Sequence, residues 1–386
     1  MQTRRFGKTE LQTTVFTLGG MRFIPPNVNA EQMLAVVRRA LDLGINHIET
    51  ARGYGPSEQL LGDIMHLIPR DELIITTKIG LTETEDEMWR YINESLERLK
   101  ISHIDNFDYH GINLPEHLEL VKRSDGCRRA VERAMSEGLI RHAGFSTHGP
   151  LEVILDSINS GIFESVNLHY YFFNQRNRAA VDRAAELDMG VFIISPADKG
   201  GRLFHPSATL SALTAPLHPL VFNQRWLLAL HPHVHTLSFG PSFADEFDPH
   251  VAGFELAGPL TEEEREIMSR MEKQFTVLGP TLCKACWECL PCPEGINIPE
   301  VLRLRNMAMA FDMEEFGRYR YKMFENAGHW FPGSKADKCT QCGDCLPRCP
   351  EGLDIPKLLF QTHDMLHTGE EGKRLFEKKE EEAAVS

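Results

Sequence analysis

Eight of the nine cysteines lie in two short runs near the C-terminal end of the chain. The runs are Cys283, Cys286, Cys289 and Cys292, followed by Cys339, Cys342, Cys345 and Cys349. Each run begins with a tight C-x2-C-x2-C repeat, and its fourth cysteine precedes a proline. This arrangement binds a cubane iron–sulfur cluster. The spacing therefore predicts two 4Fe-4S clusters.

In proteins with two such clusters, three ligands come from one loop and the fourth from the other motif. This rule gives one cluster Cys283, Cys286, Cys289 and Cys349, and the other Cys339, Cys342, Cys345 and Cys292. The first motif has two residues before its last cysteine where the usual run has three, which leaves the pairing open. Zinc prefers separated Cys or His pairs, and disulfides need an exported chain, so both fit less well.

Length and composition limit the kind of protein. The 386 residues suffice for one large domain and a small one, and 42% of them are apolar, enough for a sizeable core. The net charge of −14 disfavours nucleic acid or an anionic membrane as partner. There is no run of 18 apolar residues and no signal-peptide h-region, so we expect no membrane span. Thiols arranged for metal favour a reducing cytoplasm.

Upstream of the cysteines, short apolar strands alternate with amphipathic helices. The eight expected strands are Val15–Gly20, His47–Ala51, Leu73–Gly80, Ile104–Gly111, Ile140–His148, Glu164–Tyr171, Gly190–Ala197 and Val234–Gly240. The helices expected between them are Ala30–Leu43, Ser57–Leu67, Glu85–Leu99, Arg128–Glu137, Leu151–Asn159, Arg178–Leu187 and Phe222–Leu230. This alternation predicts an α/β fold, a (β/α)8 TIM barrel, whose chemistry lies at the C-terminal strand ends.

Complementary titratable groups follow consecutive strands. Glu49 and Tyr54 follow the second strand, Lys78 ends the third, and His110 ends the fourth. A tyrosine after a strand is most often a packing residue, and a lone lysine is most often solvated. Because barrel strands end at one mouth, we expect a carboxylate, a phenol, an amine and an imidazole to converge there.

These residues stand in recognisable motifs. Glu49-Thr-Ala-x-x-Tyr54-Gly-x-Ser-Glu and Gly138-Leu-Ile-Arg-x-x-Gly144-x-Ser146 resemble two segments of the aldo-keto reductase family. The resemblance runs from Arg4 to about residue 250, and the whole chain resembles the subgroup that carries a C-terminal ferredoxin-like domain. It implies that Tyr54 is the general acid, that Lys78 lowers the pKa of Tyr54, and that His110 orients the carbonyl. Glu49 stands where the family usually has aspartate, one methylene shorter, and is expected to pair with the lysine.

The resemblance also implies a nicotinamide site. Its expected contacts are Ser146, Thr147, Asn167, Ser195, Gly240 and Ser242. The family's ring-stacking aromatic is replaced by Ile194, and Asp198–Leu203 resembles its pyrophosphate-covering loop. After the eighth strand, Gly240 and Glu246 stand where NADPH-dependent members have cations. A carboxylate repels a 2′-phosphate but accepts from a ribose hydroxyl, so NADH is favoured within NAD(P)H.

The cysteines belong to a separate, mostly helical segment. We expect the barrel over 1–260, a helical linker over 261–280, a ferredoxin-like two-cluster domain over 281–372 and a solvated charged tail over 373–386. Ile298–Asn326 is helical in pattern. Pro293-Glu-Gly-Ile-Asn-Ile-Pro299 and Pro350-Glu-Gly-Leu-Asp-Ile-Pro356 form an internal repeat, with a helix starting at each final proline. Cys127 is a spare thiol.

Two classes of function follow from these expectations. The first is an oxidoreductase that reduces a carbonyl or related group of a small molecule, with clusters that exchange electrons with a protein carrier. Two clusters, or an additional flavin, reconcile two-electron hydride chemistry with one-electron transfer. The second is an electron-transfer or redox-sensing subunit whose barrel serves as a docking scaffold. A third possibility is that the clusters are structural only.

Overall fold

The computed structural model describes residues 1–23, 28–255 and 258–372. The expected charged tail, 373–386, lies outside the described residues. The chain divides into two compact units. The first comprises Met1–Ala197 and Asn223–Pro259, and the second comprises Asp198–Phe222 and the residues from Leu260 onward.

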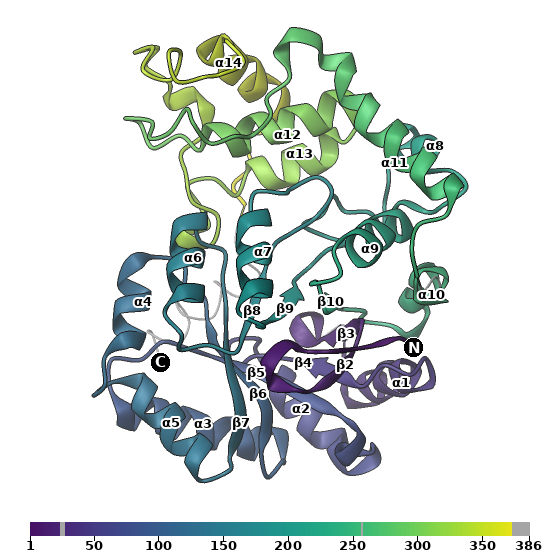
Figure 1. Cartoon of the computed structure of the whole chain (residues 1–386), viewed down its shortest axis with the longest axis vertical. Coiled ribbons are helices and arrows are strands. Elements are labelled where there is room, and N and C mark those ends of the chain that lie inside the picture. The colour runs from purple at the N-terminus through teal and green to yellow at the C-terminus, as the bar shows by residue number, and fades with distance from the viewer. Residues whose placement is uncertain (24–27, 256–257, 373–386) are drawn as a thin grey trace. The chain divides into compact units, whose positions relative to one another are not determined.

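The first unit is a closed barrel of eight parallel strands, as predicted. The strands are β3 (Phe16–Gly19), β4 (His47–Glu49), β5 (Ile74–Gly80), β6 (Ile104–His110), β7 (Ile140–Ser146), β8 (Ser165–Leu168), β9 (Gly190–Ile193) and β10 (Thr236–Phe239). They follow one another around the barrel in chain order, and β10 pairs with β3 to close it. Figure 1 shows them inside helices α1, α2, α3 and α5.

The helices of this unit lie close to their predicted positions. They are α1 (Ala30–Asp42), α2 (Ser57–Ile64), α3 (Glu85–Leu99), α5 (Cys127–Ser136), α6 (Leu151–Asn159), α7 (Arg178–Glu186) and α9 (Pro219–Leu230), whose residues up to Phe222 group with the second unit. Side-chain caps explain some of these starts, because Thr84 accepts from the Glu87 amide at the first turn of α3. The structure adds a hairpin of β1 (Thr3–Arg5) and β2 (Gln12–Thr14), and helices α4 (Pro115–Lys122) and α10 (Asp248–Glu255).

The strand register brings the chemical residues level with one another. Lys78 of β5 pairs with Asp108 of β6, and His110 of β6 pairs with Ser146 of β7. Ser146 in turn pairs with Asn167 of β8. Because side chains alternate between the two faces of a strand, this register gathers these side chains at the C-terminal end of the barrel.

The second unit is mostly helical. Its helices are α8 (Ala208–Thr214), α11 (Glu262–Gln274), α12 (Ile298–Phe311), α13 (Glu314–Tyr321) and α14 (Ile355–Leu366). Helix α11 begins with a capping box between Thr261 and Glu264. The helical stretch expected over Ile298–Asn326 is two helices, because Asp312 adopts a left-handed conformation with φ 54° and ends α12.

The predicted internal repeat is also a structural repeat. Asn297 caps α12 and Asp354 caps α14, each accepting from the backbone amide three residues on. Each helix has a proline in its first turn. Gly295 and Gly352 precede the caps with φ of 67° and 63°, a conformation open to glycine at little cost. The two cysteine motifs therefore enter their helices through the same turn.

The segment Asp198–Phe222 groups with the helical unit, although it precedes residue 260. Ser207 Oγ donates to the Phe311 carbonyl at 2.6 Å, and Tyr319 Oη donates to Asp198 at 3.4 Å. Arg270 of α11 donates to the Ala215 carbonyl at 2.6 Å. The boundaries of the units in space therefore differ from a single division at residue 260.

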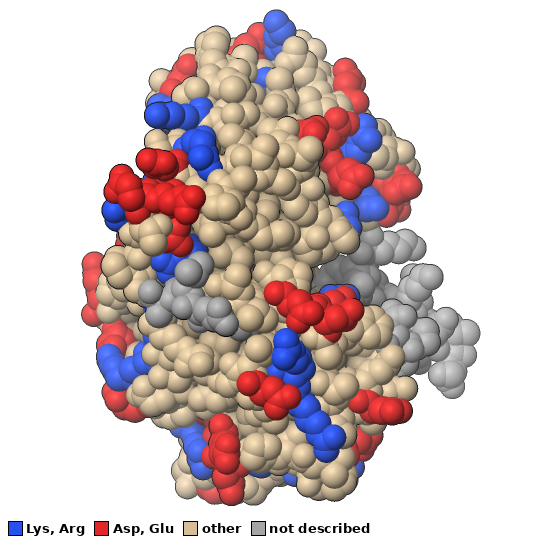
Figure 2. Space-filling view, turned by 90° about the vertical axis from the view of Figure 1, so that its right-hand side faces the viewer, with Lys and Arg blue, Asp and Glu red and all other residues tan. Residues whose placement is uncertain are grey.

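Charged side chains of both signs share the surface. On the face drawn in Figure 2, Lys and Arg lie among Asp and Glu. None of the helices in the described parts of the chain is both long enough and apolar enough to span a membrane.

Candidate functional site

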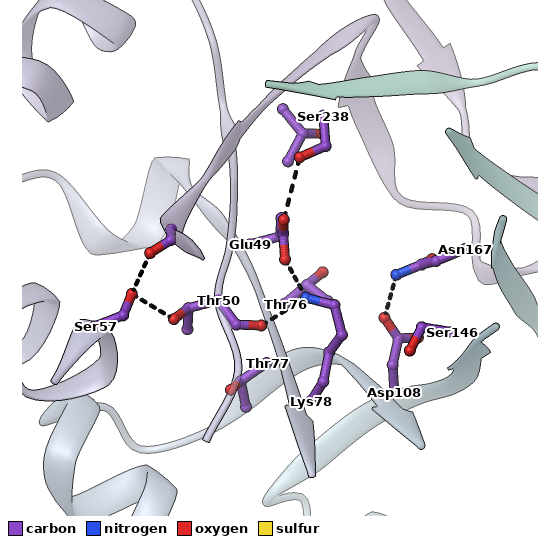
Figure 3. A network of polar contacts seen from close by, with 12 residues as sticks. Glu49, Thr50, Ser57, Thr76, Thr77, Lys78, Asp108, Ser146, Asn167 and Ser238 are labelled. Carbon is purple, nitrogen blue, oxygen red and sulfur yellow. Dashed lines mark hydrogen bonds and ion pairs between the residues drawn. The ribbon is translucent and has the colours of Figure 1, made fainter. Parts of the chain in front are cut away.

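A buried ion pair occupies the C-terminal end of the barrel. Lys78 Nζ donates to Glu49 Oε2 and, at 2.8 Å, to the carbonyl of Thr50. The other oxygen of Glu49 accepts from Ser238 Oγ of β10 at 3.1 Å (Figure 3). Glu49 therefore reaches Lys78, as expected, and its second oxygen contacts β10, which is separated from β4 by β3 alone.

The ion pair keeps Lys78 charged. Burial alone would lower the pKa of Lys78, but the charges of Glu49 and Tyr54 outweigh burial and raise the pKa above its ordinary value. An ammonium at this depth is a fixed positive charge in surroundings of low dielectric constant, where it acts strongly on its neighbours.

Tyr54 lies beside this ammonium. Lys78 Nζ is 4.8 Å from the centroid of the Tyr54 ring, and the ring meets His110 edge-on with centroids 5.6 Å apart. The pKa of Tyr54 is raised to about 12, because burial of the phenol, reinforced by Glu49, exceeds the lowering by Lys78. Lys78 therefore lowers the pKa of Tyr54, as expected, but burial has the larger effect and the net shift is upward.

Asp108 and Asn167 form a second buried pair next to the ion pair. Asn167 Nδ2 donates to Asp108 Oδ2 at 2.7 Å (Figure 3). Asn106 Nδ2 donates to Asp108 Oδ1 at 3.1 Å. Burial raises the pKa of Asp108 to about 7, against the opposing effects of Lys78 and the two amides. The carbonyl oxygen of Asn167 is buried and has no hydrogen-bond partner among the described residues.

This orphan oxygen fits a nicotinamide carboxamide. Asn167 Oδ1 can accept from an amide N–H, and the neighbouring Ser146 hydroxyl can donate to an amide carbonyl. Ser146 Oγ itself accepts from the Gly111 amide at 3.1 Å, which leaves its proton for donation. Thr147 differs, because its hydroxyl donates to the Ile112 carbonyl at 2.7 Å and so serves the loop.

The segment after β10 contacts a cation that the sequence did not reveal, an arginine that lies just after β3. Arg22 donates to both oxygens of Glu246, at 2.9 and 3.1 Å, and to the Gly240 carbonyl at 3.1 Å. The Ser242 amide also donates to Glu246, at 2.7 Å. Glu246 is therefore neutralised by Arg22, which weakens the argument that its charge repels a 2′-phosphate.

A chain of hydrogen bonds links the ends of three neighbouring strands. Tyr171 Oη donates to the Ile194 carbonyl, and it also contacts His169 Nδ1. His169 Nε2 lies 2.8 Å from His148 Nδ1. Because a carbonyl only accepts, Tyr171 must donate to it and accept from His169 Nδ1–H, and neutral His169 must then accept from His148. Ser195, after Ile194, has a left-handed φ of 52°.

In the helical unit, the cysteines gather across the two motifs. One cavity is lined by Cys339, Cys342 and Cys345 of the second motif together with Cys292 of the first. Burial raises the pKa of Cys345, and the thiols of Cys339, Cys342 and Cys292 raise it further. Four thiols around one cavity fit the four iron atoms of a cubane.

The other four cysteines form the matching set. Burial raises the pKa of Cys283, and the thiols of Cys286 and Cys349 add to it. Burial also raises the pKa of Cys289 to about 12, with contributions from Cys283, Cys286 and Cys345 of the other set. The pairing expected from the spacing, in which the fourth cysteine of each set comes from the other motif, stays a prediction.

The two cysteine loops share an unusual backbone. Ala285 and Gln341, two residues after the first cysteine of each motif, have φ of 50° and 60°. Trp287 and Gly343, two residues further on, have φ of 71° and 82°. Left-handed residues in non-glycine positions are uncommon, so their recurrence shows that both loops wrap in the same way.

Comparison with known proteins agrees with both halves of this description. Residues 16–202 match the Aldo/keto reductase family, and residues 282–353 match the 4Fe-4S dicluster domain. The chain joins an aldo-keto reductase domain to a 4Fe-4S dicluster domain. The dicluster match supports iron–sulfur clusters over zinc.

Relatives of the reductase domain are oxidoreductases by name, and the chain is an oxidoreductase. It is 28% identical over 213 residues to "Uncharacterized oxidoreductase YqkF" of Bacillus subtilis, covering 52% of this chain and 66% of that protein. It is 28% identical over 232 residues to "Pyridoxine 4-dehydrogenase" of Escherichia coli, covering 56% and 79%. The solved aldo-keto reductase AKR11C1 from Bacillus halodurans shares the fold, with a TM-score of 0.59, 23% identity, and coverage of 70% and 96%.

Several residues of the reductase domain escaped the sequence argument. Asp108 shares the face of β6 with His110, so alternation along the strand could have identified it. His169 and Tyr171 follow Asn167 at every second position, so the same alternation could have identified them. No local signal connects Arg22 with Glu246, which lie 224 positions apart. Cys127 is a buried thiol at the start of α5.

Proposed function

We propose that the reductase domain reduces a carbonyl or related group of a small molecule with hydride from a nicotinamide cofactor. The supporting observation is the buried arrangement of Tyr54, Lys78 and Glu49 at the C-terminal end of the barrel. When bound, the nicotinamide supplies hydride to the carbonyl carbon. Asn167 Oδ1 and Ser146 are the residues that would hold its carboxamide.

The protein groups handle the proton. As hydride adds to carbon, the C=O π pair moves onto oxygen, and Tyr54 Oη donates its proton there. An alkoxide is a stronger base than a phenolate, so this transfer is favourable even from a phenol with a pKa of about 12. The Lys78 ammonium stabilises the phenolate that forms. His110, whose ring meets that of Tyr54, orients the carbonyl oxygen.

We also propose that the eight clustered cysteines hold two 4Fe-4S clusters, which exchange single electrons with a protein carrier. The cavity lined by Cys292 and three cysteines of the second motif supports this ligand set. Two clusters together store the two electrons that match one hydride. Arrays of reduced thiols of this kind belong in the reducing cytoplasm.

For the dinucleotide, NADH remains the proposed form, with a narrower basis than the sequence suggested. Glu246 accepts from Arg22 and from the Ser242 amide. A ribose hydroxyl can donate to a carboxylate held in this way. A 2′-phosphate would instead have to separate Arg22 from Glu246.

The test is steady-state turnover of Tyr54→Phe with a panel of carbonyl compounds and both NADH and NADPH. Removal of the general acid should lower kcat/KM by roughly 10²–10⁴-fold. Tyr91→Phe, a tyrosine of α3 that donates to Glu87, is the matched control and should keep wild-type turnover. Unchanged turnover in Tyr54→Phe would contradict the proposal.

A second candidate is an electron-transfer or sensing subunit with a docking barrel. It is favoured by the internal use of the Thr147 hydroxyl and of Glu246, two groups expected at the cofactor site. Fluorescence titration discriminates the two functions, because a docking barrel binds neither NADH nor NADPH. Bleaching of the cluster absorbance by NADH under anaerobic conditions would favour the reductase.

A further inference from the structure

A buried arginine lies behind the first cysteine loop. Arg305 of α12 donates to the Thr281 carbonyl at 3.1 Å and to Thr281 Oγ1 at 3.0 Å, two residues before Cys283. The next residue, Asn306, donates to the Cys283 carbonyl at 2.7 Å. Helix α12 therefore holds the start of this loop and places a guanidinium next to its first thiol.

The charge of Arg305 has no carboxylate partner within 1–23, 28–255 and 258–372. Its side chain is buried, and its Nε–H has no hydrogen-bond partner among those residues. Arg303, two positions earlier on the same helix, pairs with Glu300 at 2.6 Å. Burying an unpaired charge is costly. The guanidinium holds Thr281, two residues before Cys283, so the anion that would compensate its charge is the cluster bound by that loop.

The second repeat lacks this cation. Ile298 corresponds to Ile355 at the start of each helix, so Arg305 corresponds to Thr362 in α14. Thr362 is buried and neutral, and its hydroxyl donates to the Leu358 carbonyl at 2.6 Å. The nearest counterpart is Arg348, which lines the cavity of the second set and donates to the Pro291 carbonyl at 2.8 Å. Arg348 is partly exposed to solvent, which screens its charge.

We propose that Arg305 raises the reduction potential of the cluster held by Cys283, Cys286, Cys289 and Cys349, so that this cluster accepts the first electron. The inference rests on the proposed pair of clusters. Each reduction adds one negative charge to a cluster, and the potential follows the local net charge and solvent exposure. A buried, unscreened guanidinium stabilises the reduced form more than a solvated one does.

The test is an EPR-monitored redox titration of the full-length holoprotein under anaerobic conditions. The wild type should show two one-electron steps. Arg305→Gln, which removes the charge, should lower the upper midpoint potential towards the lower one. Thr281→Asp keeps the arginine but places a carboxylate beside it, and should also lower the upper midpoint potential. Arg305→Lys and Arg348→Gln should leave it near the wild-type value.

The outcomes separate this inference from the proposed function. A wild type without two clusters contradicts the proposed clusters. Two clusters whose upper midpoint potential is unchanged in both Arg305→Gln and Thr281→Asp overturn the role of Arg305 alone, as does an equal fall in Arg348→Gln. Iron content is measured for each variant. If Arg305→Gln fails to load iron, Thr281→Asp decides.

Discussion

Two buried cations, one in each domain, are accommodated differently. Lys78 has its counter-ion within the barrel, because Glu49 and the Thr50 carbonyl surround its ammonium. Among the described residues, the guanidinium of Arg305 donates to two neutral groups, both of Thr281. The reductase site is therefore electrostatically complete before any ligand binds, whereas the dicluster domain is completed by its clusters. The first should be a rigid, preformed site, and the second should depend on iron for its stability.

Removal of the reductase cation should have the largest effect. Lys78→Met leaves Glu49 buried without its partner, which should lower the free energy of unfolding by about 3–5 kcal/mol. It also removes the charge that stabilises the Tyr54 phenolate, so turnover should fall about 10³-fold. Thermal unfolding and steady-state kinetics measure the two effects.

The double variant Glu49→Leu/Lys78→Met is the control for this prediction. Replacement of both members of a buried ion pair by apolar groups is often nearly neutral for stability. The double variant should therefore regain most of the lost stability and none of the activity. Equal destabilisation in the single and double variants would show that the pair is not the source of the effect.

Iron removal should distinguish the two domains. Metal binding that completes a fold contributes to its folding free energy. After anaerobic chelation, amide hydrogen exchange in α12 and α14 should accelerate roughly tenfold or more, while strands β5 and β6 keep their protection. Uniform acceleration in both domains, or none in the helices, would contradict the contrast between Lys78 and Arg305.

The free energy of unfolding, measured as a function of pH, tests the raised pKa of the buried Asp108 carboxyl. Its folded pKa of about 7 exceeds its ordinary value, so between about pH 4 and 7 the folded protein retains a proton that the unfolded chain has released. Stability from this group is therefore present at low pH and is lost as pH rises towards 7. Relative to Asp108→Asn, the wild type should lose about 2 kcal/mol between pH 5 and 7. If urea unfolding gives the same change in stability between pH 5 and 7 for both proteins, the prediction is wrong.

The smallest expected effect concerns cofactor choice. Glu246→Gln frees the Arg22 guanidinium from its ion pair, which should improve the affinity for NADPH relative to NADH by about tenfold, or ~1.4 kcal/mol. Arg39→Gln, which breaks a surface ion pair with Asp248 at 3.1 Å, is the control. Titration of both cofactors measures the ratio, and an unchanged ratio in Glu246→Gln would show that this carboxylate does not select the dinucleotide.

Sequence reasoning identified the barrel and the cysteine sets because their signals are local. Short apolar runs separated by amphipathic stretches specify strands and helices. The expected helices Glu85–Leu99 and Leu151–Asn159 match α3 and α6 residue for residue. Fixed cysteine spacing likewise specifies the loops.

The features of the site that the sequence did not predict depend on contacts formed only in the folded chain. Burial raises the pKa of Tyr54 and Lys78 lowers it, so residue types alone do not give the direction of the net shift. The Arg22–Glu246 ion pair joins opposite ends of the reductase domain in sequence. The apolar pattern of Ile298–Asn326 predicts a helix but not the burial of Arg305, and burial against Thr281 depends on the folded chain.

The assignment of Asp198–Phe222 to the helical unit bears on the modularity of the protein. The polypeptide passes between the two units three times, so no single cut separates them. A chain shortened at residue 260 would keep α8 but lose α11 and the Phe311 carbonyl, which accepts from Ser207. Leu210 of α8 is fully buried in the whole chain. The dicluster half therefore does not behave as a transferable cassette, and grafting it onto another reductase would require replacement of the loop after β9 as well.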